Sequence, residues 1–192
     1  TLAIAHKSAG RYGQAQKMLE RALTIYERHS SKTLAISETL NNLAVIYATT
    51  GSHKKARNLF ERALTLKIQS LGPSHPTIAT ILTNLAALRI IEKDFLGAKS
   101  LLERALSIQE QAFSPETPAI AETLQNLAEV HIASDMAEKA LPLLEHAADI
   151  YSKHRDFQKE AFYTRFNLAK AIIAAGGART RAIVMAKVAR DG

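Results

Sequence analysis

The sequence repeats itself with a period of about 42 residues. The tripeptide Asn-Leu-Ala occurs four times, and the leucines of successive copies, beginning with a truncated copy at Leu2-Ala3, are 41 or 42 residues apart. A period of roughly 20 to 50 residues is typical of stacked-repeat proteins, in which each unit packs only on its neighbours. The complete copies are Asn42-Leu43-Ala44, Asn84-Leu85-Ala86, Asn126-Leu127-Ala128 and Asn167-Leu168-Ala169.

Each repeat has the pattern of two amphipathic helices joined by a turn. In the copy over 33–71, apolar residues recur three or four positions apart on either side of Gly51. Gly72-Pro73 ends the second stripe, because Gly suits a helix C-cap and Pro cannot continue a helix. No segment shows sustained two-residue alternation, so we expect no sheet.

The same pattern in every copy predicts ten helices. Ser74 and Thr117 are the expected N-caps where Pro follows in the first turn. First helices are expected near 1–9, 33–50, 75–92, 117–134 and 158–175, and second helices near 12–29, 53–70, 95–112, 137–154 and 179–190.

Alanine occupies three equivalent positions in all five copies. A small residue at a helix crossing lets two helices approach closely, because interaxial distance follows side-chain size at the contact. These positions are Ala3, Ala44, Ala86, Ala128 and Ala169 on the first helices, and Ala15, Ala56, Ala98, Ala140, Ala182, Ala22, Ala63, Ala105, Ala147 and Ala189 on the second.

This arrangement resembles the tetratricopeptide repeat (TPR), a helix pair of about 34 residues. The eight additional residues amount to about one extra turn on each helix. Long repeats of this kind, and the loop Leu71–Pro76 in particular, resemble those of kinesin light chains.

The resemblance implies an all-α fold, a right-handed α-solenoid of stacked antiparallel helix pairs. We expect a single domain over 1–192, belonging to a longer protein. Its repeats are expected at 1–32 (partial), 33–74, 75–116, 117–156 and 157–192.

Composition and motifs point away from catalysis and cofactors. The chain has no cysteine, 47% hydrophobic residues and a net charge of +7. It carries none of the common nucleotide-binding, hydrolase or metalloprotease motifs, and its histidines do not form a helical pair spaced for metal binding. No apolar run is long enough to span a bilayer. We expect no enzyme activity, metal site, cofactor or membrane insertion, and a cytoplasmic location.

The resemblance implies that the first helices line a concave groove and that the residue before the Leu-Ala pair points into it. That residue is Asn42, Asn84, Asn126 or Asn167 in the complete copies. An amide both donates and accepts hydrogen bonds, so it can pair with the backbone of an extended peptide. The alternative is that these amides bond to neighbouring repeats and support stacking.

Other side chains share this helical face at fixed offsets from each Asn. They are mostly neutral or acidic, so a clamp of basic residues around a peptide carboxylate is not expected. We predict a neutral or mildly basic peptide, with apolar anchors at Ile90, Ile91 and the Tyr163–Phe166 end. The other groove candidates are Asn41, Thr83, Gln125, Glu129, Phe166 and Lys170.

The fifth repeat departs from the pattern. Arg165 stands where the earlier repeats have Leu40, Leu82 and Leu124, and one extra residue lies near Gly176-Gly177. Its second helix, around Ile183–Val188, is apolar on more than one face, whereas a terminal repeat normally ends in a polar capping helix.

The sequence thus predicts a protein–protein interaction scaffold that binds a peptide segment of a partner, in cis or in trans. One alternative is a structural module that forms homo-oligomers through its terminal helices. Another is a regulatory repeat domain of a larger signalling protein. Nucleic-acid binding through basic second helices is a weaker alternative, because Lys and Arg are interleaved with Glu and not massed in a tract, and we expect no such partner.

Overall fold

The structure is a computed structural model that describes residues 12–28 and 33–176. Within these residues it contains eight α-helices, one short 3-10 turn and no β-strand, which confirms the all-α fold. The chain divides into two compact units, Thr1–Leu88 and Arg89–Gly192, which are described in turn. The helices expected near 1–9 and 179–190 lie outside the described residues.

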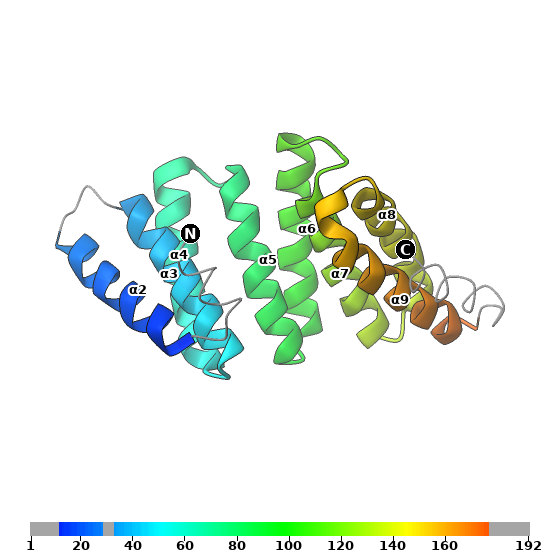
Figure 1. Ribbon diagram of the computed structural model, residues 1–192, viewed down its shortest axis with the longest axis horizontal. Helices are drawn as coiled ribbons and strands as arrows, with labels where there is room; N and C mark the ends of the chain where they lie inside the picture. Colours follow the sequence, from blue (N-terminus) through cyan, green and yellow to red (C-terminus); the bar gives the residue numbers. More distant parts are fainter. Residues whose placement is uncertain (1–11, 29–32, 177–192) are drawn as a thin grey trace. The chain divides into compact units, whose positions relative to one another are not determined.

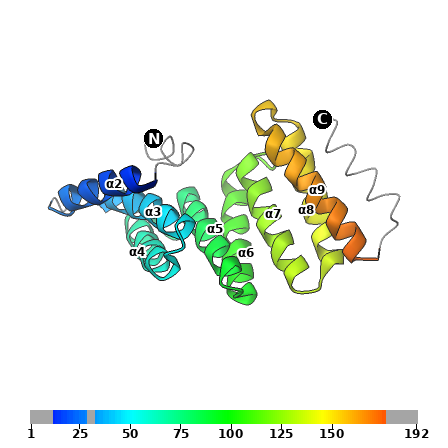
Figure 2. The ribbon, with the colours of Figure 1, turned by 60° about the horizontal axis from the view of Figure 1, so that its bottom comes forward.

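The first unit contains α2 (Tyr12–Glu27), α3 (Thr33–Thr49), α4 (His53–Leu71) and most of α5 (Pro76–Ile91). Helices α3 and α4 run antiparallel, and α2 packs beside α3 (Figures 1 and 2). The buried Ser37 hydroxyl donates to the Ala63 carbonyl at 2.8 Å and fixes α3 against α4.

A polar contact joins α2 to α3. The Tyr47 hydroxyl donates to Glu20 at 2.9 Å and accepts from Gln16 at 3.2 Å. Burial, followed by the hydrogen bond to Glu20, raises the pKa of Tyr47. Because the contact links the second helix of one repeat to the first helix of the next, it holds successive repeats together.

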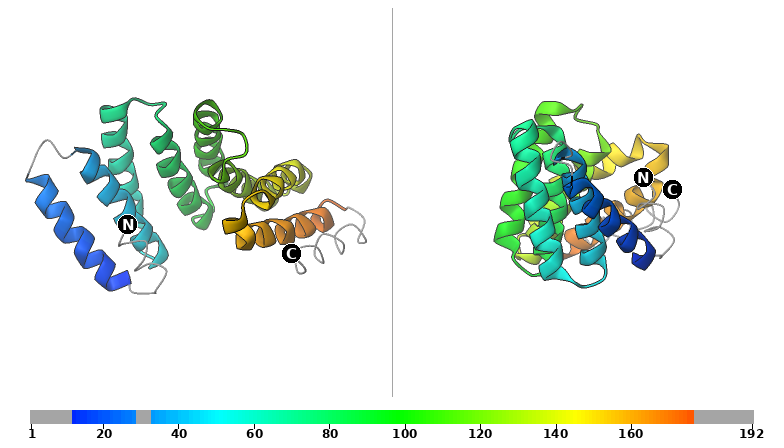
Figure 3. Two further views of the ribbon diagram at one scale, coloured as in Figure 1. Left: turned by 45° about the horizontal axis from the view of Figure 1, so that its top comes forward. Right: turned by 90° about the vertical axis from the view of Figure 1, so that its left-hand side faces the viewer.

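The second unit contains α6 (Phe95–Ala112), α7 (Pro118–Ala133), α8 (Ala137–Ser152), the 3-10 turn η2 (Arg155–Phe157) and α9 (Gln158–Ala174). Helices α7 and α8 form an antiparallel pair, and α9 packs on α8 (Figure 3). Their core is formed by small and branched apolar side chains, among them Ala128, Leu144, Leu168 and Ile172.

The alanines expected at the helix crossings are buried. All but Ala22, which is half-buried, have at most 5% of their surface exposed, and Ala3, Ala182 and Ala189 lie outside the described residues. The buried alanines are Ala15, Ala44, Ala56, Ala63, Ala86, Ala98, Ala105, Ala128, Ala140, Ala147 and Ala169.

In the described part of the chain, the turn that follows each first helix uses a left-handed residue at one repeat position. Gly51 has φ 81° and Gly176 has φ 72°, and Lys93 and Asp135 adopt φ 61° and 58° at the equivalent positions. Glycine populates this region readily, whereas a side chain with a Cβ is strained there. The conformation is therefore a property of the repeat and does not depend on a glycine.

One expected N-cap is wrong. Helix α5 begins at Pro76, so His75 and not Ser74 precedes it. The His75 ring Nδ1 accepts from the Thr77 backbone N–H at 3.3 Å, and its carbonyl accepts from Ile78 at 2.9 Å. Thr117 precedes α7 as expected, although its side chain makes no capping hydrogen bond.

Candidate functional site

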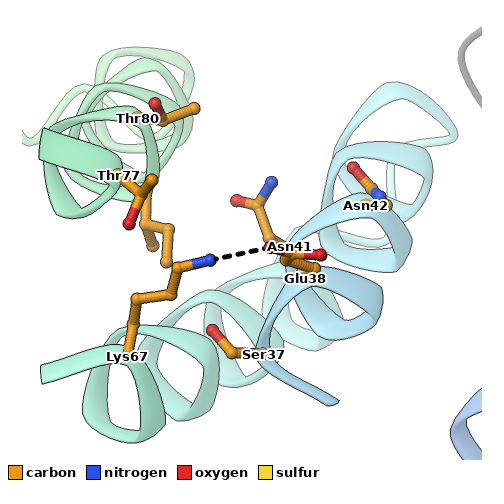
Figure 4. A pocket seen from close by; sticks show the side chains of 8 residues that line it. Ser37, Glu38, Asn41, Asn42, Lys67, Thr77 and Thr80 are labelled. Carbon is orange, nitrogen blue, oxygen red and sulfur yellow. Dashed lines mark hydrogen bonds and ion pairs between the residues drawn. The ribbon is translucent and has the colours of Figure 1, made fainter. Parts of the chain in front are cut away.

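A pocket of about 280 Å³ opens beside α3, α4 and α5 in the first unit (Figure 4). Amide, hydroxyl, carboxylate and ammonium groups all reach it, so it can both donate and accept hydrogen bonds. The lining residues are Ser37, Glu38, Asn41, Asn42, Lys67, Thr77, Thr80 and Ile81.

Lys67 is the buried cation of this pocket. Its side chain rises from α4, has 6% of its surface exposed, and places Nζ 3.3 Å from Glu38 Oε1 (Figure 4). Burying an ammonium is costly unless it is paired and hydrogen-bonded. Glu38 is the only hydrogen-bond acceptor that the described part of the chain offers to Nζ. An ammonium has three N–H donors, so this pocket retains donor capacity.

Lys67 was not among the groove candidates, because those were chosen on the first helices, whereas Lys67 reaches the pocket from a second helix. The missed signal is the repeat position four residues after Ala63, Ala105 and Ala147 on the second helices. This position is occupied by Lys67, Gln109 and Tyr151, long side chains with polar ends that are all at least 95% buried.

Gln109 shows what this position does in the second unit. Its amide nitrogen donates to the Ala119 carbonyl on the following helix at 3.1 Å. A second-helix side chain here thus reaches the junction with the next first helix. At the same repeat position Lys67 bonds to Glu38, on the first helix of its own repeat.

The asparagines of the first unit have different surroundings. Asn84 Nδ2 donates to Asn41 Oδ1 at 3.1 Å, which joins α5 to α3. Asn42 is half-buried and lines the pocket. Contact between repeats, one of the two roles expected for these amides, is thus observed for Asn84.

Thr83 differs from the other groove candidates of the first unit. Only 4% of its surface is exposed, so its side chain is not accessible to a ligand in this structure. It lies next to Asn84 on α5.

The remaining candidates lie in the second unit. Gln125 and Asn126 are half-buried on α7, and Glu129 is exposed one turn further along. On α9, Lys170 Nζ lies 5.3 Å from the Phe166 ring centre and 3.5 Å from Asn167 Oδ1.

Helix α9 also exposes large apolar side chains. Tyr163, Phe166 and Ile173 keep 61%, 45% and 60% of their surface accessible. Because Tyr163 and Phe166 share a face with Lys170 and Asn167, the polar and aromatic candidates of this helix form one surface.

The described residues contain no group of three or more His, Asp or Glu side chains placed to hold a metal ion. Among the described helices, none combines the length and the apolar character needed to cross a membrane. The apolar segment around Ile183–Val188 lies outside the described residues.

Comparison with solved structures finds the same architecture in several proteins. The kinesin light chain-type TPR-like repeats of Podosopora anserina match with a TM-score of 0.80 and 23% identity, over 99% of this chain and 90% of that one. BtubC (BKLC) from P. vanneervenii matches with a TM-score of 0.87 and 21% identity, over 99% of this chain and 76% of that one. A Rap protein complexed with competence and sporulation factor matches with a TM-score of 0.80 and 18% identity, over 98% of this chain and 50% of that one.

The TM-scores of these three matches show a shared fold. No curated protein matches the sequence. The family model for the tetratricopeptide repeat matches residues 1–69, 35–95 and 77–153, which together cover most of the chain. Repeats of this type form protein-interaction scaffolds. The chain belongs to the tetratricopeptide repeat family.

Proposed function

We propose that this chain is a peptide-binding module whose first unit holds an extended segment of a partner protein across α3 and α5. The observation that supports this most directly is the position of Asn42, half-buried in the wall of an open polar pocket. A primary amide there can donate to a peptide carbonyl and accept from a peptide N–H. Such contacts recognise a backbone and tolerate many side chains.

The pocket has room for one side chain of a peptide. Its volume of about 280 Å³ is close to the lower end of the roughly 300–1,000 Å³ of small-molecule sites. Thr77 and Thr80 supply hydroxyls on one side, and the Lys67–Glu38 pair supplies charges of both signs on the other. We propose that a polar side chain of the bound segment enters here while its backbone passes Asn42.

The charge around the pocket favours a peptide that is neutral or mildly basic. Lys67 is buried and paired, whereas the Glu38 side chain keeps 67% of its surface exposed. An approaching ligand therefore meets the carboxylate before the ammonium. The Rap protein, which shares the fold, is complexed with competence and sporulation factor, and we propose a comparable ligand-binding role for this chain.

We propose that the exposed aromatic surface of α9 supplies apolar anchors in the second unit. Tyr163 and Phe166 are large and accessible, and aromatic residues are enriched among the residues that dominate interface energies. Lys170 lies over the Phe166 ring, so this surface offers a cation beside its aromatic groups. We infer a binding role and no catalysis.

The test uses a displayed library of 12-residue random peptides selected against the intact chain. Selected peptides are then measured against the Asn42→Ala variant and against Asn58→Ala, which removes an exposed amide from α4. The proposal predicts that Asn42→Ala weakens binding by at least tenfold, while Asn58→Ala binds as the parent chain does. Peptides that bind Asn42→Ala unchanged would show that this pocket is not their site.

A further inference from the structure

The fifth repeat places an arginine where the repeat pattern requires a core leucine. Leu40, Leu82 and Leu124 occupy this position in the preceding repeats and have at most 4% of their surface exposed. Arg165 is half-buried at the equivalent position on α9. Because leucine would pack here without the cost of burying a charge, the arginine calls for a functional explanation.

Arg165 lines a second pocket, of about 240 Å³, at the junction of α8, η2 and α9. None of the described residues that line it carries a carboxylate. Within the described residues, neither Arg155 nor Arg165 forms an ion pair. Besides the two arginines, the lining includes Tyr151, His154 and Gln158.

The turn that carries Arg155 is held in place by aromatic packing. Phe157 stacks on the buried Tyr151 ring, with centroids 5.8 Å apart and an interplanar angle of 20°. His154 packs edge-on against Phe157 at 6.2 Å. The preceding two repeats enter their first helices through a proline loop, whereas here a 3-10 turn, Arg155–Phe157, which carries one arginine and one aspartate, leads into α9. The connection is thus both chemically different and ordered.

Lys153 and His154, beside the pocket, already make hydrogen bonds to other residues. Lys153 Nζ lies 2.8 Å from Glu116 and 2.9 Å from Asp149, and these hydrogen bonds raise its pKa to about 12. His154 Nε2 lies 2.8 Å from the Glu116 carbonyl oxygen and donates to it. The donors that the lining offers include the two guanidinium groups and the Gln158 amide.

We propose that this pocket binds a phosphate group. A guanidinium carries a planar fork of N–H donors that matches phosphate oxygens bidentately. Two such forks and an amide supply more donors than the two oxygens of a carboxylate use. The phosphate is carried either by a phosphorylated side chain of a partner or by free phosphate ion, and both present the same oxygens to Arg155 and Arg165.

The test compares the intact chain with Arg165→Leu, which restores the leucine of the other repeats. This variant is expected to fold at least as stably as the parent chain, because it adds core packing and removes a half-buried charge. Arg155→Ala, in the exposed turn, provides a second variant with little risk to folding. Lys54→Ala, an exposed lysine of α4, is the matched control.

The readout is the ³¹P line width of inorganic phosphate at pH 8, followed by titration of a phosphoserine peptide and its unphosphorylated form. The parent chain and Lys54→Ala should broaden the phosphate line, while Arg165→Leu and Arg155→Ala should each reduce the broadening severalfold. Tighter binding of the phosphopeptide than of phosphate would identify a phosphorylated side chain as the source, and equal or weaker binding would identify the free ion. Equal broadening by Arg165→Leu, or equal displacement of phosphate by acetate and by sulfate, would overturn the proposal.

Discussion

Asn84 donates a hydrogen bond from Nδ2 to Asn41 Oδ1 at 3.1 Å, and this bond crosses the junction between two repeats of the first unit. The two residues are not equivalent in the repeat, because Asn84 aligns with Asn42 and not with Asn41. The asparagines of the regularly spaced Asn-Leu-Ala motif can therefore have different roles. Asn84 joins helices, and Asn42 lines a pocket.

This difference predicts unequal effects on stability. Asn84→Ala should lower the free energy of unfolding by about 1 kcal/mol, because it removes a hydrogen bond and leaves the half-buried Asn41 amide without its partner. Asn42→Ala should change it by less than about 0.5 kcal/mol. Urea unfolding of both variants measures this. A double-mutant cycle of Asn41→Ala and Asn84→Ala should give a coupling energy of roughly 0.5–1 kcal/mol. Equal losses from Asn42→Ala and Asn84→Ala would contradict the assignment.

The Lys67–Glu38 pair predicts that substituting its two members has unequal effects on the free energy of unfolding. Glu38→Gln should destabilise the chain by about 1 kcal/mol, because it leaves a buried ammonium with a weaker acceptor, an effect moderated by the exposure of Glu38. The free energy of unfolding of Lys67→Met should stay within about 1 kcal/mol of that of the parent chain, since an apolar side chain of similar length can replace a buried cation at little cost. Chemical denaturation tests both variants, and a larger loss from Lys67→Met than from Glu38→Gln would refute this description of the pair.

The left-handed turn position predicts a stabilising substitution. Lys93 is exposed and adopts φ 61°, where a residue with a Cβ is strained. Lys93→Gly should therefore raise the free energy of unfolding by roughly 0.5–1 kcal/mol, and Gly51→Ala should lower it by about 1 kcal/mol. Asp135→Gly should raise the free energy of unfolding by less than Lys93→Gly does, because Asp tolerates this conformation better than Lys. Thermal unfolding ranks the three variants, and destabilisation by Lys93→Gly would show that its side chain makes contacts that outweigh the strain.

Much of the fold follows from the sequence because its determinants are local. Apolar spacing, the crossing alanines and Gly51 place most described helix ends within two residues of the structure. The N-cap of α5 was not predictable from residue preference alone, because His75 accepts the backbone N–H that Ser74 was expected to cap.

The site is less predictable because it depends on how helices are offset. The Asn41–Asn84 bond requires the relative height of α3 and α5, which a repeat period does not specify. Lys67 lies within an apolar stretch of its helix in the sequence, and only the packing shows that its amine reaches the pocket from α4. Aligning the polar residues four positions after each crossing alanine would have identified it.

His131 predicts a pH dependence of stability. Burial, followed by the charge of Lys99, lowers the pKa of this histidine in the folded chain, with Lys139 acting in the same direction and Glu103 opposing. Its Nδ1 has no hydrogen-bond partner among the described residues. The unfolded chain therefore binds this proton more readily, so the contribution of His131 is complete above its unfolded pKa of about 6.5 and is lost as the pH falls below it.

The variant that isolates this effect is His131→Tyr, which introduces the residue that Tyr47 supplies at the same repeat position. Between pH 7.5 and pH 5.5 the parent chain should lose more of its free energy of unfolding than the variant does. Urea unfolding at several pH values measures the difference. Parallel pH profiles for the two chains would show that His131 is not the titrating group.

The most direct measurement of peptide binding in the first unit is site-specific photocrosslinking of library-selected peptides. A benzophenone side chain placed at Thr80, an exposed residue lining the pocket, is compared with one at Thr65, an exposed threonine of α4 outside it. Irradiation should produce a covalent peptide adduct at Thr80, identified by mass spectrometry, and little or none at Thr65. Equal adducts at both positions, or an adduct at Thr65 alone, would contradict binding across α3 and α5.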